Sequence, residues 1–498
     1  MRRTRWAENA NVRWLPCIAA AGRIFCARPV AASALAAREA GALDGRNRDI
    51  QSARSEEKER DAMRNTRLSW TPIACCLAAA FLCRASAGEP TGQQLLTASG
   101  KPAEGPLDVF LGEPIFDMQV VFDSGNDVRE PYLAIAVDGT LLAVRNYQKQ
   151  LRRSEDGGRS WGDIIEAPIT HSDSNMLVDE NTGSVMSVRM WDGADKVFRS
   201  SDHGKTWVAE ETVIKPNELM KRLEETGVKK RATKGDQGKS GTYYLHANAS
   251  EAGVTLRHGQ YKGRLLVSAT FRPHAKAHPS DREPADAIFS CAVFSDDHGA
   301  TWQVSDFFPE GYTEEAALVE LHDGRIYYNS RSHSGYYDKA LARPLRPEET
   351  LRREAWSDDG GQTWKKLRTS PVLPDGGGYG RGYGMKGGLA RLPVKGRDIL
   401  IFSNADTAGG DRKKMTVWAS FDGGETWPVK RLVYAPHGAY SSLAAGRPAT
   451  ASQGRVYLLF EGGPDGRYSA MRVARFNLSW ILEGERTGNG QVPEWVLP

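Results

Sequence analysis

Short runs of apolar, β-branched and aromatic residues recur along this chain, and each is followed by a polar turn rich in Asp and Gly. Clear examples lie at 196–199, 287–294 and 415–419. Runs of this kind are typical of β-strands joined by tight turns. A helical pattern is expected only at 216–230 (PNELMKRLEETGVKK), which we interpret as an insertion between strands. The pattern therefore predicts an all-β fold.

The turns carry a repeated motif, Ser-x-Asp-x-Gly-x-Thr/Ser-Trp. Its five copies lie at 154–161, 200–207, 295–302, 357–364 and 420–427. Asp in a tight turn accepts hydrogen bonds from backbone N–H groups two residues on, and Gly supplies the positive φ that the turn needs. Thr-Trp is expected to begin the next strand. Each copy therefore predicts a hairpin anchored by Trp.

The spacing of the copies predicts the architecture. Their Asp residues lie 46, 95, 62 and 63 positions apart along the chain. A motif repeated at this scale indicates a repeated supersecondary unit, and a propeller blade has about four strands. The 95-residue step is wide enough for one blade without the motif. Five marked blades and one unmarked blade predict a six-bladed β-propeller.

The charge of the chain argues against a nucleic-acid partner. The formal net charge is +4, but residues 1–62 hold 12 Lys and Arg against 8 Asp and Glu. The remainder is balanced, with 54 residues of each sign. No basic surface field is therefore expected on the folded part.

Residues 63–87 have the pattern of a secretory signal. Met63 opens a short basic stretch, an apolar run follows over 68–82, and 85–87 (Ala-Ser-Ala) matches a cleavage site. The apolar run is too short for a membrane span, and Pro72 interrupts it. We expect translation to start at Met63, with 1–62 a poorly ordered artefact of the gene model or, alternatively, an Arg-rich leader. The protein is then secreted or periplasmic, with one domain over 88–498.

Cysteine and histidine usage points to no disulfide, metal or cofactor. Five of the six cysteines lie before residue 88, and Cys291 stands in an apolar run, where we expect a buried side chain. The His residues are scattered, without Cys or carboxylate at metal-ligand spacing.

The motif resembles the Asp box (BNR repeat) of the sialidases, where it lies on the outer rim, away from the substrate. Four further segments resemble sialidase segments, in the order of that family. They are 128–134 (VREPYLA, with Glu where the family has Ile), 314–331, 402–412 and 439–443. The resemblance covers 115–480 and implies a sialidase-type six-bladed β-propeller.

The resemblance also implies a site. Arg129, Arg331 and Arg412 would grip the carboxylate of the substrate, because guanidinium groups bind planar carboxylates through paired hydrogen bonds. Tyr440 would be the nucleophile, since a neutral hydroxyl avoids repulsion by that carboxylate. Sialidases are exceptions to the scheme with two catalytic carboxylates. Glu315 would take the tyrosine proton.

One expected residue is missing. The family has an acid/base Asp between the first Arg segment and the first Asp box, but 142–153 contains neither Asp nor Glu. Asp192, Asp195 and Glu251 are the alternatives from neighbouring segments. Glu461 ends an apolar strand near the site and is assigned no role.

A second departure is 384–388 (GMKGG), where sialidases usually have Cys-Gln-Gly-Ser. We expect Lys386 to add positive charge near the mouth of the site. The Gly-rich run 376–384 is expected to form a loop beside the cleft that brings candidate substrate contacts: Tyr379, Arg381 and Tyr383.

Together these features predict a secreted glycoside hydrolase that releases terminal sialic acid, or a related acidic sugar, from glycans with retention. One alternative is a hydrolase of the same fold acting on a different sugar. The other is a glycan-binding propeller without catalysis, which the missing Asp favours.

Overall fold

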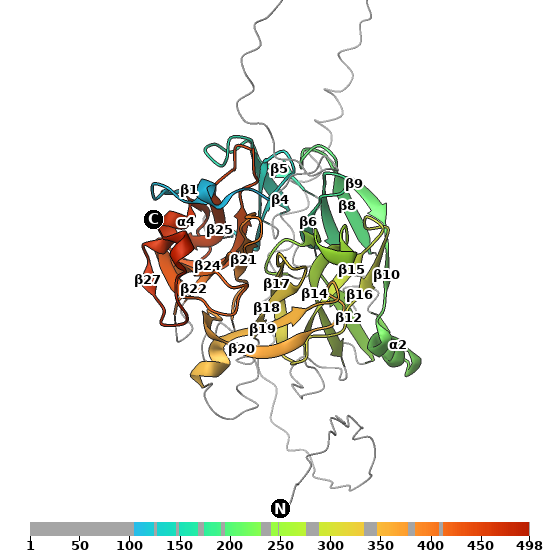
Figure 1. The fold of residues 1–498 in the computed structure, drawn as a ribbon. Helices are drawn as coiled ribbons and strands as arrows, with labels where there is room; N and C mark the ends of the chain where they lie inside the picture. Colours follow the sequence, from blue (N-terminus) through green and yellow to red (C-terminus); the bar gives the residue numbers. More distant parts are fainter. Residues whose placement is uncertain are drawn as a thin grey trace, which may run out of the picture. The chain divides into compact units, whose positions relative to one another are not determined.

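The computed structural model describes residues 104–497, except for gaps at 124–126, 146–148, 168–173, 191–194, 231–240, 248, 275–287, 333–345, 377–383 and 408–411. The predicted leader (1–62) and signal (63–87) lie outside the described residues. The described part is mostly β-sheet, which confirms the all-β prediction (Figure 1). Its helical elements are short: η1 (Leu107–Phe110), α2 (Glu218–Glu225), η4 (Gly259–Tyr261), η7 (Pro347–Thr350), α4 (Leu478–Leu482) and η8 (Glu494–Val496).

Three of the sheets are antiparallel meanders of four strands. The first has β2 (Pro131–Ile135), β3 (Leu141–Arg145), β4 (Gln150–Ser154) and β5 (Ile165–Glu166). The second has β6 (Ser174–Asp179), β7 (Ser184–Arg189), β8 (Lys196–Ser200) and β9 (Val208–Glu211). The third has β17 (Thr313–Glu320), β18 (Ile326–Ser332), β19 (Leu351–Ser357) and β20 (Lys365–Pro374).

The wide step between the second and third motif copies is occupied by a single seven-stranded sheet. Its strands are β10 (Val213–Lys215), β11 (Lys229–Lys230), β12 (Thr242–His246), β13 (Val254–Thr255), β14 (Leu265–His274), β15 (Phe289–Ser295) and β16 (Thr301–Val304). The expected helical insertion is confirmed as α2. The expectation of an unmarked blade in this step is wrong, because α2 and the short strands β10, β11 and β13 take up the extra length within one sheet.

The last sheet has eight strands and joins the two ends of the described chain. It comprises β1 (Phe116–Asp123), β21 (Gly388–Arg391), β22 (Leu400–Ala405), β23 (Lys413–Ser420), β24 (Val429–Ala445), β25 (Val456–Gly463), β26 (Ala470–Phe476) and β27 (Glu485–Arg486). The first half of β24 pairs with β23 and the second half with β25. β1 pairs with β26, so blue and red segments lie side by side in Figure 1. The four-stranded unit without the motif therefore lies here, at the end of the chain.

All five motif copies form the predicted turn, with one difference in its hydrogen bonds. In the first copy Asp156 accepts bonds from the backbone N–H of Arg159 and Ser160, three and four residues on (2.9 and 3.0 Å), rather than two. Gly158 N–H donates to the Ser154 hydroxyl (2.8 Å), and the φ of Gly158 is 78°. The Thr-Trp pair opens a strand only in the third copy, at β16. Elsewhere the strand begins after Trp.

Six hydrophobic clusters form the core of the described part, most of them between neighbouring sheets. Cys291 is fully buried in one of them, as expected. Six strands contact one another in succession, β2 with β6, β6 with β14, β14 with β17, β17 with β21, β21 with β24, and β24 with β2. We call these six the inner strands. They come from five separate sheets.

Candidate active site

The five residues predicted for the site lie in or beside five different strands. Arg129 directly precedes β2, and Glu315 lies near the start of β17. Arg412 precedes β23, and Tyr440 lies in β24 where that strand turns from one partner to the next. Arg331 is near the end of β18, antiparallel to β17, and therefore meets Glu315.

The three arginines surround the ring of Tyr440. The guanidinium carbons of Arg129, Arg331 and Arg412 lie 5.2, 5.9 and 4.9 Å from the centre of that ring. Tyr440 itself is buried, with 6% of its surface exposed. The structure thus brings the predicted arginines together around the predicted nucleophile.

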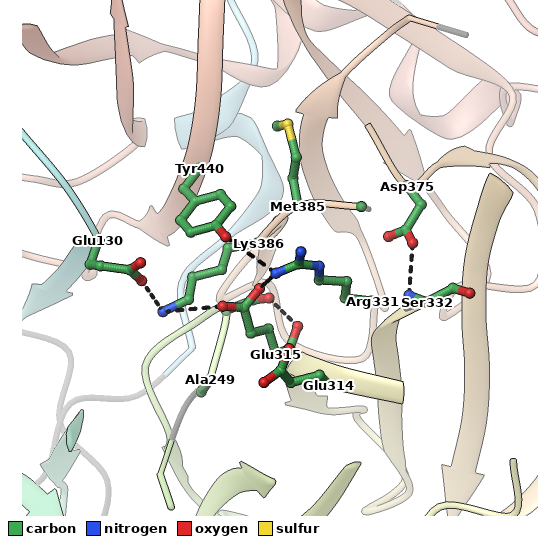
Figure 2. A network of polar contacts seen from close by, with 12 residues as sticks. Glu130, Ala249, Glu314, Glu315, Arg331, Ser332, Asp375, Met385, Lys386 and Tyr440 are labelled. Carbon is green, nitrogen blue, oxygen red and sulfur yellow. Dashed lines mark hydrogen bonds and ion pairs between the residues drawn. The ribbon is translucent and has the colours of Figure 1, made fainter. Parts of the chain in front are cut away.

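Glu315 and Tyr440 are linked through Arg331 (Figure 2). One Arg331 nitrogen, Nη1, donates both to Glu315 Oε2 and to the Tyr440 hydroxyl, the latter at 3.2 Å. Burial raises the pKa of Tyr440, Arg331 lowers it and Glu315 raises it again, with a net increase. The phenol is therefore neutral at ordinary pH and needs a base to react as a nucleophile.

The local backbone turns Glu315 toward the site. Its φ of 39° lies in the left-handed region, and the pairing of β17 with β18 shifts register between Glu314 and Ala317. A β-bulge of this kind re-aims a side chain and is common beside active sites. The Ser250 hydroxyl donates to the Glu315 carbonyl and holds the bulge.

Glu461 belongs to the site, although its role was not predicted. Its side chain is fully buried in β25, and Oε1 accepts bonds from Arg129 Nε (3.1 Å) and Glu130 N (2.8 Å). Its Oε2 accepts from Tyr440 N at 3.3 Å. Burial raises the pKa of Glu461 to about 7, although Arg129 opposes the shift. The sequence signal was a carboxylate that ends an apolar run, where burial requires a partner.

Tyr468 is a further residue that the sequence did not indicate. The guanidinium of Arg129 stacks 4.4 Å from the centre of its ring, and Arg412 Nη1 donates to its hydroxyl at 3.4 Å. Its carbonyl accepts from Val128 N at 3.2 Å. Tyr468 therefore contacts two of the three arginines from the β25–β26 connection, a segment without a recognisable motif.

Lys386 is buried beside the site residues and is not exposed at the mouth of the site, which corrects our expectation. It is fully buried, and its Nζ lies 2.5 Å from Glu130 Oε2 (Figure 2). Burial alone would lower the pKa of Lys386, but Glu130, Tyr132 and Glu315 raise it well above its usual value. The ammonium is therefore a permanent charge inside the protein.

Arg331 is supported from behind by a second buried ion pair. Arg352 Nη1 lies 2.8 Å from Asp375 Oδ1, and Asp375 Oδ2 accepts from Ser332 N at 2.7 Å. Burial raises the pKa of Asp375 to about 6, against the opposing effect of Arg352. Gly384 has a φ of 67°, and a Cβ there would lie 2.5 Å from Asp375 and 2.9 Å from Arg331. Only glycine leaves these two side chains in place.

Glu251, one alternative for the missing acid, is fixed away from Tyr440. Its carboxylate accepts four hydrogen bonds, from Ala252 N, Leu389 N, Leu443 N and the Ser442 hydroxyl, at 2.5–3.1 Å. It lines a cavity of about 210 Å³ that also contacts late residues of the inner strands, including Glu320 and Arg391. Burial raises the pKa of Glu251 to about 8, although its hydrogen bonds lower it. Glu251 thus joins inner strands instead of facing a substrate.

Asp195, another alternative for the acid, accepts a hydrogen bond at 2.6 Å from Lys230, a residue outside the described site. Asp192 and the three loop candidates Tyr379, Arg381 and Tyr383 lie outside the described residues. Among the described residues, no group of three or more His, Cys, Asp or Glu could hold a metal ion.

No helix in the described part of the chain is long and apolar enough to cross a bilayer.

Chemically, the site combines a cluster of guanidinium groups with a neutral phenol. Three guanidinium groups suit a planar carboxylate ligand, because each offers parallel N–H donors. The phenol of Tyr440 lies among them, and the Glu315 carboxylate contacts the same Arg331 nitrogen as the phenol does.

Comparisons with known proteins show what the chain is similar to. Residues 182–458, more than half of the chain, match the family model of the BNR repeat-like domain. A sialidase of Micromonospora viridifaciens is 29% identical over 438 residues, covering 82% of this chain and 60% of the relative. A sialidase of Bacteroides fragilis (strain YCH46) is 25% identical over 371 residues, covering 65% and 58%. The chain thus spans about three fifths of the length of these relatives.

Solved structures show the same fold. A leech intramolecular trans-sialidase complexed with 2,7-anhydro-Neu5Ac has a TM-score of 0.50 at 14% identity, covering 73% of this chain and 71% of that one. NanB with Optactamide also gives 0.50 at 14% identity, covering 74% and 71%. The likeness shows the fold of the sialidases, which are β-propellers. With its five Asp boxes and the matching family model, the chain belongs to the sialidase family with BNR repeats.

Proposed function

We propose that this protein is a glycoside hydrolase of the sialidase type, releasing a terminal sialic acid or a related carboxylated sugar from glycans. The observation that carries this proposal is the placement of three guanidinium groups within 4.9–5.9 Å of one buried tyrosine ring. A substrate carboxylate held by all three would bring the adjacent anomeric carbon to the phenol. The names of the two relatives, both sialidases, support the same substrate class.

Tyr440 is the proposed nucleophile and Glu315 the proposed base. The phenolic oxygen forms a bond to the anomeric carbon while its proton passes to Glu315, and the glycosidic bond breaks. The leaving oxygen takes a proton from solvent or from an acid, and an aryl group leaves as phenolate without one. Water then attacks the same carbon from the opposite face and loses a proton to solvent, the bond to Tyr440 breaks, and Tyr440 regains its proton from Glu315. Two displacements, each with inversion, give net retention.

Arg331 has to change partners in this scheme. Without substrate its Nη1 contacts both Glu315 and Tyr440. A bound carboxylate competes for that nitrogen through a charge-assisted hydrogen bond. Glu315 is then available for the tyrosine proton at the moment when the substrate is in place.

We further infer that the sheets form six blades around the site. The eight-stranded sheet divides at β24, which changes partner from β23 to β25, and the other four sheets are one blade each. The contacts between successive inner strands return from β24 to β2. The pairing of β1 with β26 supports closure by the two ends of the domain.

We also propose that the protein is secreted, on the basis of the signal-like pattern of residues 63–87.

The test is a panel of fluorogenic aryl glycosides that includes an aryl sialoside beside aryl glycosides without a carboxylate. We expect hydrolysis of the sialoside alone, with the α anomer of the sugar appearing first by NMR. Fast turnover of the aryl sialoside with slow turnover of sialyl oligosaccharides fits the missing acid in 142–153. Binding of sialyl glycans without any hydrolysis favours the glycan-binding alternative. Hydrolysis of an uncharged glycoside alone contradicts the proposal.

A further inference from the structure

Two departures from the sialidase pattern meet in the structure. Glu130 stands where the family has Ile, and Lys386 lies in the segment that replaces Cys-Gln-Gly-Ser. They are 256 positions apart in the sequence, yet Glu130 Oε2 and Lys386 Nζ lie 2.5 Å apart. Lys386 is fully buried, and Glu130 is 7% exposed. In this chain two positions that are uncharged in the family therefore hold the two partners of a buried ion pair.

The pair lies against the reacting groups. Lys386 Nζ is 4.0 Å from Glu315 Oε1 and 5.8 Å from the centre of the Tyr440 ring. Arg331 contacts the other oxygen of Glu315, Oε2. The carboxylate of Glu315 therefore lies between two cations, one on each oxygen (Figure 2).

Glu130 is held in this place against the preference of its backbone. Its φ is 62°, which a residue with a side chain adopts only at a cost. Its N–H donates to Glu461 Oε1 at 2.8 Å, and Arg129 Nη2 lies 3.3 Å from its Oε1. The strained backbone conformation of Glu130 persists only because these surrounding contacts hold it in place.

We propose that Lys386 and Glu130 form a positioning pair that keeps the Glu315 carboxylate aimed at Tyr440. This inference rests on the proposed function, because it takes Glu315 as the base. Arg331 cannot do this alone, since a substrate carboxylate competes for its guanidinium. Lys386 does not contact the substrate and stays beside Glu315 throughout. Glu130 balances the buried ammonium, which would otherwise carry an unpaired charge.

The charged and titratable groups around the pair come from five strands or strand ends. Arg129, Glu130 and Tyr132 belong to the β2 segment, Glu315 to β17, Arg331 to β18, Tyr440 to β24 and Glu461 to β25. Lys386 Nζ is 3.3 Å from the Tyr132 hydroxyl. Burial raises the pKa of Tyr132 to about 12, although Lys386 lowers it. Lys386, Arg331 and both tyrosines keep their protons at neutral pH, because the pKa of each is raised.

The test compares Lys386→Gln, Glu130→Gln and the double variant on an aryl sialoside, with kcat and KM measured separately. For Lys386→Gln we expect kcat to fall roughly tenfold to hundredfold with little change in KM, because Glu315 is no longer held toward Tyr440 while the arginines remain. The double variant removes the unpaired charge of Glu130 but still lacks the cation, so its kcat should stay low, and recovery of kcat would overturn the positioning pair. The control is the ion pair of Lys430 and Asp406 (2.6 Å), whose variants Lys430→Gln and Asp406→Asn should leave kcat and KM unchanged.

A second readout does not need activity. Urea unfolding of Lys386→Gln, Glu315→Gln and their combination forms a double-mutant cycle, and we expect the two substitutions to be coupled rather than additive. Additive unfolding effects overturn the positioning pair, and so does a folded Lys386→Gln protein with the wild-type kcat. A wild-type protein that is inactive on all sialosides contradicts the proposed function instead, while coupling in the cycle still supports the contact of Lys386 with Glu315.

Discussion

Arg331 and Tyr440 are hydrogen bonded, with the guanidinium Nη1 of Arg331 at 3.2 Å from the phenolic oxygen. The same nitrogen contacts Glu315, so one group of the anion-binding surface also separates the proposed base from the proposed nucleophile. In the proposed mechanism, substrate binding and activation of the nucleophile are coupled through this single side chain.

Tyr440→Phe removes the nucleophilic oxygen and keeps the buried ring. We expect hydrolysis of an aryl sialoside to fall at least about 10³-fold, because loss of a nucleophile removes the covalent route. Thermal unfolding should change little, since the ring still packs among the arginines. Tyr434→Phe is the control, because Tyr434 packs on Phe460 with ring centres 5.6 Å apart and lies outside the site. Equal activity in the two variants would exclude Tyr440 as the nucleophile.

Arg412→Lys keeps the charge but loses the planar fork. Arg412 Nη2 donates to the Gly384 carbonyl at 3.1 Å, which fixes the direction of the guanidinium. We expect KM for the sialoside to rise roughly tenfold to hundredfold, the size of one or two charge-assisted hydrogen bonds. Arg431→Lys, which alters a surface pair with Glu483 (2.9 Å), is the matched control. Steady-state kinetics of both variants decide whether Arg412 binds substrate.

We expect Tyr468 to affect substrate binding indirectly, by orienting the guanidinium groups of Arg129 and Arg412. Tyr468→Ala removes both the stacking and the hydroxyl, and we expect KM to rise about threefold to thirtyfold, as for loss of a cation–π contact. Tyr468→Phe retains the ring and should recover most of this loss. A structural defect would lower the unfolding temperature and kcat together. If Phe and Ala behave alike, stacking on Arg129 is unimportant.

The raised pKa of Glu461 should make the free energy of unfolding depend on pH. Its pKa is about 7 in the folded protein, because of burial first, against an ordinary value of 4.5. A raised carboxylate pKa stabilises the fold at low pH, and this stabilisation is lost as pH rises from about 4.5 through about 7.

Glu461→Gln should therefore flatten the decline of unfolding free energy between pH 5 and 8, by at most about 1.4 kcal/mol per pH unit. Chemical denaturation at four pH values measures this slope. Glu483→Gln serves as the surface control, since its side chain is 54% exposed. An unchanged slope in Glu461→Gln would show that Arg129 keeps the buried carboxylate ionised throughout.

The fold was predictable from the sequence where local chemistry determines it. The Ser-x-Asp-x-Gly turn satisfies its own backbone N–H groups, so each copy forms the same hairpin regardless of the rest of the chain. The unmarked unit was misplaced, because sequence spacing cannot distinguish an insertion from a blade. α2 and β10 lengthen one sheet, while the unmarked unit pairs the distant strands β1 and β26.

The site residues were predictable where they stand in segments that resemble those of the sialidase family. Arg129, Glu315, Arg331, Arg412 and Tyr440 stand in segments with a recognisable order, and the structure brings them together. Lys386 was misplaced, because its charge pairs with a residue 256 positions away, and only tertiary packing brings Glu130 beside it. Tyr468 has no signal of its own, since an aromatic residue in a connection has many possible partners.

The most direct measurement of the central claim is the mass of the protein after incubation with 2,3-difluorosialic acid. Tyr440 should displace the anomeric fluoride and form a bond to that carbon, while the second fluorine slows hydrolysis of the product. We predict an adduct of one sugar per chain, mapped by peptide sequencing to Tyr440 and absent in Tyr440→Phe. An adduct on another residue, or none in a preparation that hydrolyses aryl sialosides, would contradict the assignment of Tyr440 as nucleophile.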